Sequence, residues 1–265
     1  MRYTLPELAP AEFLARLPKH IPGLIAQLLY SRGLSNESEI EEFLNPSFET
    51  GLHSPFLFRN MEAAVARIFL ALQNQETVAI HGDYDADGVT GSALLYETLK
   101  YLSKVLNSTS RLQIHIPNRE RDGYGLSLAT VLKLAGDGAQ LIITVDCGVA
   151  SVKECEHAQT LGVDVIVVDH HAAPEQLSTS AILLHPHLPG ETYPFKPLAA
   201  VGVAYKLACA LIIRARERNL PIAAGFEKWL LDLVAIATVT DVMPLVGENR
   251  VLEKFGLMPL KKTRR

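Results

Sequence analysis

The sequence predicts an α/β fold: a parallel β-sheet of approximately five strands with helices on both faces. Five short apolar runs rich in Val, Ile and Leu recur along the chain, and helical stretches separate most of them. Continuous apolar strands joined through helices are typical of parallel sheets that are buried on both sides. With 265 residues and 48% hydrophobic content, the chain can bury a core of this kind.

The first part of the chain, residues 1–56, is predicted to be a short helical N-terminal appendage. Ser35 is the expected N-cap of a helix over "NESEIEEFL", and Pro46 closes that segment. From Asn60 onward, apolar residues at helical spacing lead into the first predicted strand. The main domain is therefore expected to span 57–255.

The main domain is predicted from alternating strand and helix patterns. The strands are expected at 77–80, 112–117, 140–146, 164–169 and 181–186. Two later helices are expected at 200–215 and 224–240. The last residues, 256–265, hold several basic side chains and are predicted to be a basic tail or the start of a linking helix.

Charge and cysteine content limit the classes of function. The net charge of −4 and the pI near 6.1 do not indicate a nucleic-acid-binding protein, so such a role must depend on local patches. Cys147, Cys155 and Cys209 are too few and too irregularly spaced for a disulfide framework or a zinc knuckle. No signal-like or membrane-spanning segment is recognised, because the longest apolar stretch contains Tyr205 and Lys206. A cytoplasmic protein is expected.

The segment "TVAIHGDYDADGVTG" places four candidate ligands, His81, Asp83, Asp85 and Asp87, at every second position. If the chain stays extended here, these side chains share one face. Carboxylates held this closely either take up protons or require a cation. Hard oxygen ligands with one imidazole favour Mg²⁺ or Mn²⁺.

A calcium-binding loop is the alternative for this segment, because Asp83-x-Asp85-x-Asp87-Gly88 matches the first six positions of an EF-hand. The twelfth position is Leu94, where an EF-hand requires a bidentate Glu. The preceding residues are also β-rich, where a helix is required. The sequence therefore disfavours calcium.

Further acids and histidines follow the ends of other predicted elements. Asp146 ends "LIITVD", the run Asp169, His170, His171 ends "VIVVDHH", and Asp241 follows the last predicted helix. In parallel sheets, ligands bind at the carboxyl ends of the strands. Taken singly, Asp146 has an alternative role as the cap of the following helix, and the histidines as surface loop residues. Asp241 alone is better explained as the cap of a turn before Pro244. Their convergence from separate segments favours a common site.

These motifs together resemble a known family. The set "HGDYDADGVTG", "PNRERDGYGLS", "TVDCG", "VDHH" and "ATVTDVMPL", in this order, resembles the DHH phosphoesterase superfamily. Within it, the chain is similar to the catalytic core of RecJ-type single-strand-specific 5′ exonucleases over roughly residues 60–255. The spacing His81-x-x-x-Asp85-x-Asp87 is also shared with family II inorganic pyrophosphatases.

The resemblance implies a site for two Mn²⁺ or Mg²⁺ ions. One ion would be held by His81, Asp85 and Asp146, and the other by Asp87, Asp146, His170 and Asp241, with Asp146 bridging. Asp83 would support this cluster, and Asp169 would orient the paired histidines. The catalytic residues implied are Asp85, Asp146 and His171, with two-metal activation of water.

The resemblance also implies a substrate-binding loop. Its expected contacts are Asn118, Arg119, Arg121, Tyr124, Gly125 and, beside the phosphate, His171. Arginines with an exposed aromatic ring suit the backbone and bases of a single strand. The alternative reading of this loop is a polar connection between a strand and a helix. The amides near Gly88 and Gly91 are expected to receive a phosphate, and Gly202 is a further candidate contact.

The function implied is 5′-to-3′ exonuclease hydrolysis of single-stranded DNA in recombination and DNA repair. Strand polarity and the preference for DNA come from the resemblance alone, as do a single-strand-binding protein and a helicase as partners. RecJ-type chains continue into a second domain, whereas this one stops at "GLMPLKKTRR", so a fragment with weak activity is expected. The alternatives are an oligoribonucleotide or cyclic-dinucleotide phosphodiesterase, a pyrophosphatase, or a non-catalytic DHH scaffold.

Overall fold

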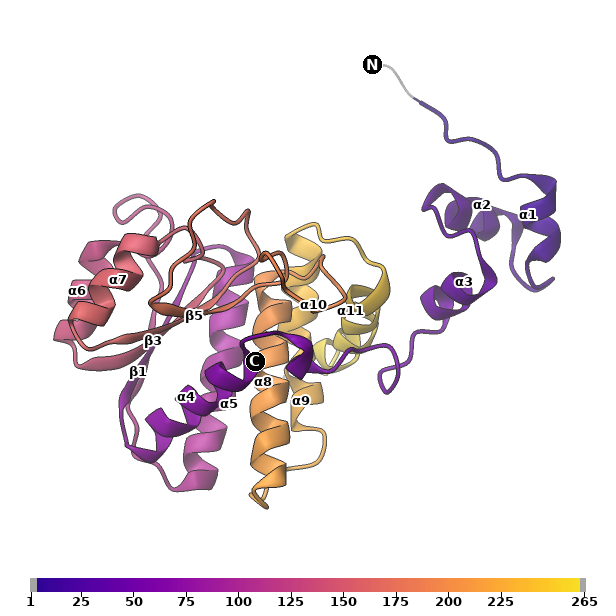
Figure 1. Cartoon of the computed structure of the whole chain (residues 1–265). Coiled ribbons are helices and arrows are strands. Elements are labelled where there is room, and N and C mark those ends of the chain that lie inside the picture. The colour runs from indigo at the N-terminus through magenta and orange to yellow at the C-terminus, as the bar shows by residue number, and fades with distance from the viewer. Residues whose placement is uncertain (1–3, 263–265) are drawn as a thin grey trace. The chain divides into compact units, whose positions relative to one another are not determined.

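The structure is a computed structural model that describes residues 4–262 (Figure 1). The chain divides into two compact units, Met1–Gly51 and Leu52–Arg265, whereas the sequence analysis placed the division after residue 56. No helix among the described residues has both the length and the apolar character needed to cross a membrane.

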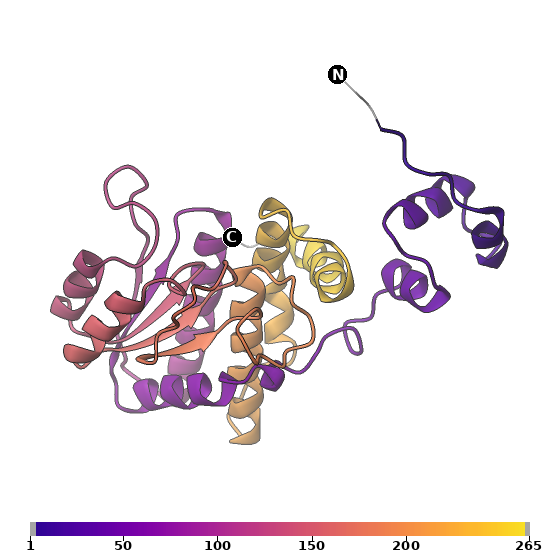
Figure 2. The ribbon, with the colours of Figure 1, turned by 45° about the horizontal axis from the view of Figure 1, so that its top comes forward.

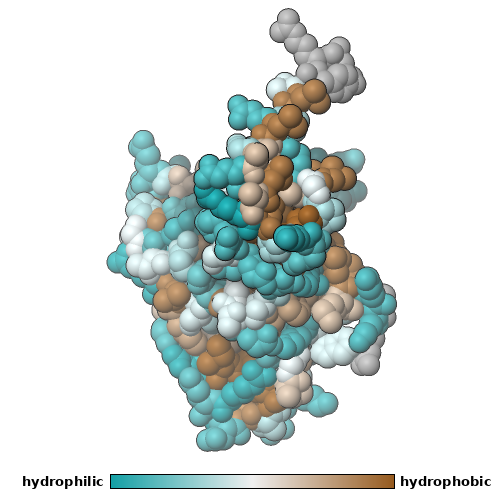
Figure 3. Space-filling view, turned by 90° about the vertical axis from the view of Figure 1, so that its right-hand side faces the viewer, coloured by the Kyte–Doolittle hydropathy of each residue, from teal (hydrophilic) through white to brown (hydrophobic). Residues whose placement is uncertain are grey.

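The first unit contains three short helices, α1 (Ala11–Arg16), α2 (Gly23–Ser31) and α3 (Glu37–Leu44). They pack around Phe13, Leu29 and Ile40. The N-cap of α3 is Asn36 and not the predicted Ser35, because the Asn36 side chain accepts a hydrogen bond from the Glu39 amide at 2.8 Å. Several apolar side chains of this unit are exposed, and Figure 3 shows hydrophobic residues among hydrophilic ones on the face it presents.

The second unit is built on a five-stranded parallel sheet, which confirms the predicted fold class. Its strands are β1 (Thr77–Gly82), β2 (Leu112–His115), β3 (Ala139–Val145), β4 (Asp164–Val168) and β5 (Ala181–Leu184). They lie in the order β2-β1-β3-β4-β5, and all neighbours are parallel. β1, β3 and β4 are almost completely buried, as their continuous apolar runs require.

Helices cover both faces of the sheet (Figures 1 and 2). One face carries α6 (Leu128–Gly136) and α7 (Val152–Thr160), and the other carries α4 (Met61–Gln73), α5 (Ala86–Leu106) and α8 (Ala200–Glu217). Alternate strand residues point to opposite faces. On the α6 and α7 side, the buried core includes Ala79, Ile142, Val165, Val167, Val131, Leu134 and Cys155.

The remaining helices pack beside α5 and α8. They are a short 3-10 helix, η1 (Pro55–Leu57), and the helices α9 (Phe226–Trp229), α10 (Leu231–Thr240) and α11 (Gly247–Leu260). The helix predicted at 224–240 is therefore two helices, which meet at Leu230. Residues 256–260 of the predicted tail belong to α11, and residues 263–265 lie outside the described residues.

A buried ion pair joins α8 to α11. Lys206 lies 2.5 Å from Glu248, and both side chains are at most 2% exposed. The Tyr193 hydroxyl donates to the second Glu248 oxygen at 2.6 Å, and Lys206 also donates to the His53 carbonyl at 3.0 Å. Each charge is thus hydrogen-bonded, which offsets the cost of removing both ions from water. This network explains how "VAYKLACAL" forms a buried helix despite its lysine.

The sheet order fixes where a ligand can bind. The connection leaving β1 leads to β2 on one side, whereas the next strand, β3, pairs on the other side of β1. A crevice forms where the connections diverge in this way, outside the carboxyl ends of the strands. The segments that follow β1 and β3 are "DYDADG" and "DCG", so the candidate ligands lie beside this crevice.

Candidate metal centre

The turn from β1 to α5 carries the first group of acids. Asp85 caps α5, because its Oδ1 accepts hydrogen bonds from the amides of Asp87 at 2.9 Å and Gly88 at 3.0 Å. A Cβ at Gly88 would lie 2.5 Å from the Asp83 backbone, so only glycine allows the helix to begin this close to β1. The extended backbone therefore ends with β1 at Gly82. The prediction that extended backbone places alternate side chains on one face was wrong for Asp85 and Asp87, which lie at the start of α5.

Asp87 joins this turn to the start of α8. Its two carboxylate oxygens accept hydrogen bonds from the backbone amides of Ala200 at 2.7 Å and Val201 at 2.8 Å. Asp87 Oδ2 also lies 3.7 Å from His170 Nε2. Burial, together with the charge of Asp146, raises the pKa of Asp87 to about 7. The helix N-terminus favours the charged form of this carboxylate.

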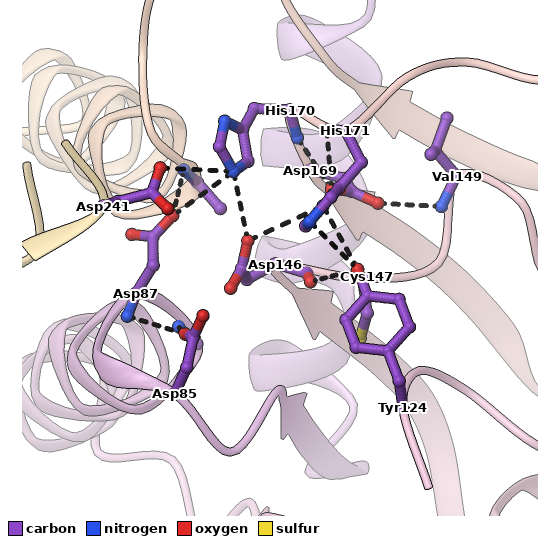
Figure 4. Close-up of polar contacts among 12 residues, drawn as sticks. Asp85, Asp87, Tyr124, Asp146, Cys147, Val149, Asp169, His170, His171 and Asp241 are labelled. Carbon is purple, nitrogen blue, oxygen red and sulfur yellow. Dashed lines mark hydrogen bonds and ion pairs between the residues drawn. The ribbon is translucent and has the colours of Figure 1, made fainter. Parts of the chain in front are cut away.

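Asp146 lies directly after β3 at the middle of the group (Figure 4). Its Oδ1 is 3.3 Å from His170 Nε2 and 3.7 Å from His171 Nδ1. It does not cap the following helix, since the N-cap of α7 is Ser151. Burial, together with the charge of nearby Asp85, raises the pKa of Asp146 to about 9.

Asp169 organises the two histidines that follow β4. Asp169 Oδ1 accepts from the amides of His170 at 2.7 Å and His171 at 3.2 Å, and from His171 Nδ1 at 2.8 Å. Its other oxygen accepts from the Val149 amide at 3.0 Å. Although burial alone would raise it, these hydrogen bonds hold the pKa of Asp169 below its ordinary value. The hydrogen bond to Asp169 raises the pKa of His171 to about 9.

The structure brings the predicted acids and histidines into three overlapping groups whose ligand atoms lie within 4.8 Å of one another. These groups are Asp146, His170, His171; Asp87, His170, Asp241; and Asp83, Asp85, Asp146. Asp146 and His170 each belong to two of them. Asp83 Oδ1 and Asp146 Oδ1 are buried and accept no hydrogen bond from the described residues. Uncompensated buried oxygens of this kind fit a divalent cation.

His81 is the one predicted ligand that lies outside these three groups. It is fully buried; its Nδ1 lies 3.0 Å from His115 Nδ1, and its Nε2 lies 3.3 Å from the Gly125 carbonyl oxygen. Burial lowers the pKa of His81 to about 4, so the imidazole is neutral at neutral pH. Its role as a metal ligand stays a prediction.

The loop between β2 and α6 reaches the same group of residues. The Tyr124 hydroxyl donates to the Asp146 carbonyl at 3.0 Å and lies 3.1 Å from His171 Nδ1. Arg119 lies 5.2 Å from the ring centre of Tyr84, an exposed cation–π contact. Asn118 is exposed, and its Oδ1 accepts from two amides within the loop, which shapes the turn.

The predicted glycine contacts have different outcomes. The amide of Gly88 donates to Asp85, so the prediction that it receives a phosphate was wrong. Gly91 is buried, and a Cβ there would meet Val145 at 2.6 Å, which indicates close packing of α5 against β3. Gly202 lies within the buried part of α8, where an added Cβ would meet Leu198 at 3.1 Å. Arg121 is exposed on the loop, and its substrate contact stays a prediction.

His185 is a residue that the sequence analysis missed. It follows β5, is fully buried, and its Nε2 lies 2.7 Å from the His171 carbonyl oxygen. Its Nδ1 accepts from the His187 amide at 3.0 Å, so Nε2 carries the proton and donates to His171. His185 thus fixes the backbone of the paired histidines. The feature of the sequence that could have identified His185 is its position at the end of a predicted strand.

Comparison with known proteins agrees with this geometry. Residues 77–238 match the family model described as "DHH family, N-terminal domain". The chain is 40% identical over 246 residues to the single-stranded-DNA-specific exonuclease RecJ of Bacillus subtilis, and 37% identical over 253 residues to that of Escherichia coli. Both alignments cover 93% of this chain, but only 29% and 42% of the two relatives.

Solved structures give the same result. A crystal structure of exonuclease RecJ bound to manganese matches 76% of this chain and 48% of its own, with a TM-score of 0.65 and 34% identity. RecJ from Thermus thermophilus in complex with Mn²⁺ matches 97% of this chain and 34% of its own, with a TM-score of 0.74 and 28% identity. The family model covers more than half of the described residues, and its match includes the segments that follow β1, β3 and β4. The chain therefore belongs to the DHH family and contains its N-terminal domain.

Proposed function

We propose that this chain is the catalytic core of a metal-dependent exonuclease that hydrolyses phosphodiester bonds of single-stranded DNA. The observation that carries the proposal is the overlap of three ligand groups through Asp146 and His170 at the carboxyl edge of the sheet. Two neighbouring cations sharing ligands are the usual arrangement for hydrolysis of phosphate esters. The similarity to RecJ proteins supports single-stranded DNA as the substrate class.

The residues that would hold Mn²⁺ or Mg²⁺ are Asp87, Asp146, His170 and Asp241, joined by Asp83, Asp85 and the predicted ligand His81. Bound divalent ions would lower the pKa of water and neutralise charge on the phosphate. Asp87 is held for this role by the N-terminus of α8. Asp146 is held by the tight turn after β3, where its φ is +63°.

His171 is proposed to act directly on the phosphate. Its Nδ1 donates to Asp169, and this hydrogen bond raises the pKa of the imidazole to about 9 in the metal-free site, which favours the protonated form. The Nε2 proton is then available for a phosphate oxygen or for the leaving oxygen. Burial raises the pKa of Tyr124, so its hydroxyl stays protonated and continues to donate to the Asp146 carbonyl beside His171.

The loop between β2 and α6 is proposed to bind the strand. Arg119 and Arg121 are exposed cations that suit phosphate groups, and Tyr124 on the same loop is an exposed aromatic ring that suits bases. Other parts of this proposal rest on the family resemblance. They are the 5′-to-3′ direction, the preference for DNA, a cytoplasmic role in recombination and repair, and action together with a single-strand-binding protein and a helicase.

The test is Mn²⁺-dependent nucleotide release from single-stranded oligonucleotides labelled at either end. We expect slow release by the unchanged chain and none by Asp146→Ala. Asp137→Ala is the matched control, since Asp137 is exposed and pairs with Lys133 on α6, away from the ligand groups. Calorimetry should show Mn²⁺ binding in the unchanged chain and in Asp137→Ala.

Each alternative function has its own outcome in this experiment. Tight Mn²⁺ binding with cleavage of dinucleotides but not of longer strands would favour a small-substrate phosphodiesterase. Mn²⁺-dependent hydrolysis of pyrophosphate alone would favour a pyrophosphatase. Absence of Mn²⁺ binding would contradict the proposal and favour a non-catalytic scaffold.

A further inference from the structure

The end of α10 has an unusual residue at its turn. The Val242 amide donates to the Val239 carbonyl at 3.2 Å, and the Met243 amide donates to the Thr238 carbonyl at 3.1 Å. These two hydrogen bonds define a Schellman C-cap, in which the residue after the cap takes a left-handed conformation. That residue is Val242, with φ of +56°. Glycine is preferred here, because a Cβ is crowded by the backbone, and a β-branched residue is suited worst.

The strain at Val242 has no visible compensation from packing. Val242 is 85% exposed, so its side chain buries almost no apolar surface. Among the residues that the structure describes, the other non-glycine residues at positive φ are Gln75, Asn107, Asp146 and Asn219. All of them carry an amide or a carboxylate; Asn and Asp in particular tolerate this conformation. Val242 is thus both strained and uncovered.

Val242 borders the metal centre. It directly follows Asp241, whose carboxylate lies 3.7 Å from His170 Nε2. Figure 4 shows Asp241 and Tyr124 on opposite sides of Asp146. The turn at Val242 therefore flanks the ligand groups across from the loop that carries Arg119 and Arg121.

We propose that Val242 contacts the substrate directly, by packing on the sugar and base of the nucleotide bound beside the scissile phosphate. This inference rests on the proposed function, because it places the phosphate at the metal centre. Phosphates call for charged contacts, which the arginines opposite provide, whereas the sugar and base present apolar surface. Local strain that packing does not explain is characteristic of functional sites.

The test compares Val242→Gly with a matched change in the same motif. Asn219 has φ of +59° in the Schellman turn that ends α8, and it is exposed. It lies about 27 Å along the helix from the N-terminus of α8 that binds Asp87, at 1.5 Å per residue. Asn219→Gly therefore changes the same kind of turn away from the site. Val242→Ile keeps a β-branched apolar side chain at the turn.

We expect Val242→Gly to melt at the same or a higher temperature than the unchanged chain, since glycine relieves the strain. Its KM for a single-stranded oligonucleotide should rise about tenfold, equivalent to about 1.4 kcal/mol of lost contact, with kcat within about twofold. Asn219→Gly should keep the KM of the unchanged chain, and Val242→Ile should raise the KM less than Val242→Gly does.

Two results would overturn the inference. An unchanged KM in Val242→Gly would remove the substrate contact, and a clear fall in its melting temperature would show that Val242 stabilises the fold. A failure of the unchanged chain to bind or cleave single-stranded DNA contradicts the proposed function itself, and this inference with it. Cleavage by the unchanged chain with no effect of Val242→Gly contradicts the inference alone.

Discussion

Replacing Asp146 with Asn should stabilise the metal-free protein while removing metal binding. The Asp146 carboxyl is 2% exposed, and burial and Asp85 raise its pKa from 3.8 to about 9. Between these two values, the unfolded chain releases a proton that the folded chain retains. Raising the pH through this range therefore lowers the free energy of unfolding. Asn carries no charge in either state and removes this dependence.

The magnitude follows from the size of the pKa shift. Each pH unit between these two pKa values lowers the stability of the metal-free protein by about 1.4 kcal/mol through Asp146. For a domain of this size, 1 kcal/mol moves the melting temperature by about 3 °C. The difference in melting temperature between Asp146→Asn and the unchanged chain should therefore grow by several degrees from pH 6 to pH 8.

The assay is thermal unfolding in a chelating buffer at several pH values, repeated with Mn²⁺. Mn²⁺ should raise the melting temperature of the unchanged chain and leave that of Asp146→Asn almost unchanged, since binding to the folded state stabilises it. Asp137→Asn, at the exposed C-cap of α6, is the control. A stability difference that does not change with pH, or that favours the unchanged chain without metal, would refute the reasoning.

Three further substitutions test the supports of the site and the fold. His185→Phe keeps an aromatic side chain but leaves the His171 carbonyl without its donor. The free energy of unfolding should fall by about 1–3 kcal/mol in urea unfolding, and the affinity for Mn²⁺ should fall with it. An unchanged affinity for Mn²⁺ would contradict the proposal that His185 positions His171. Asp87→Ala leaves the amides of Ala200 and Val201 without their acceptor, so a loss of about 1–3 kcal/mol is expected in the same assay at about pH 4, where the raised pKa of Asp87 contributes little. Full stability of this variant would contradict the capping of α8 by Asp87. Lys206→Met leaves Glu248 buried without its cation and should cost about 3–5 kcal/mol, a loss that the second change Glu248→Gln should reduce. A double variant as unstable as the single one would show that packing, and not charge, is responsible.

Much of the fold follows from local patterns. Each strand was recognisable as a short apolar run, and the alternation with helices required a parallel sheet. Because the carboxyl ends of parallel strands meet at one edge, the acids after β1 and β3 and the histidines after β4 had to lie near one another. The sequence therefore indicates where the candidate site lies in the fold. The ends of elements are less well predicted, as the N-cap at Asn36 and the break between helices at Leu230 show.

The tertiary structure decided how each group in the site is held. The amides that bind Asp87 come from a helix more than 110 residues further along the chain, and the imidazole that fixes His171 comes from the end of another strand. The left-handed conformation of Val242 likewise depends on how α10 ends beside the site. Sequence patterns report periodicity and local preference. Hydrogen bonds between distant segments, and strain accepted at one residue, arise only when the whole sheet and its helices are packed together.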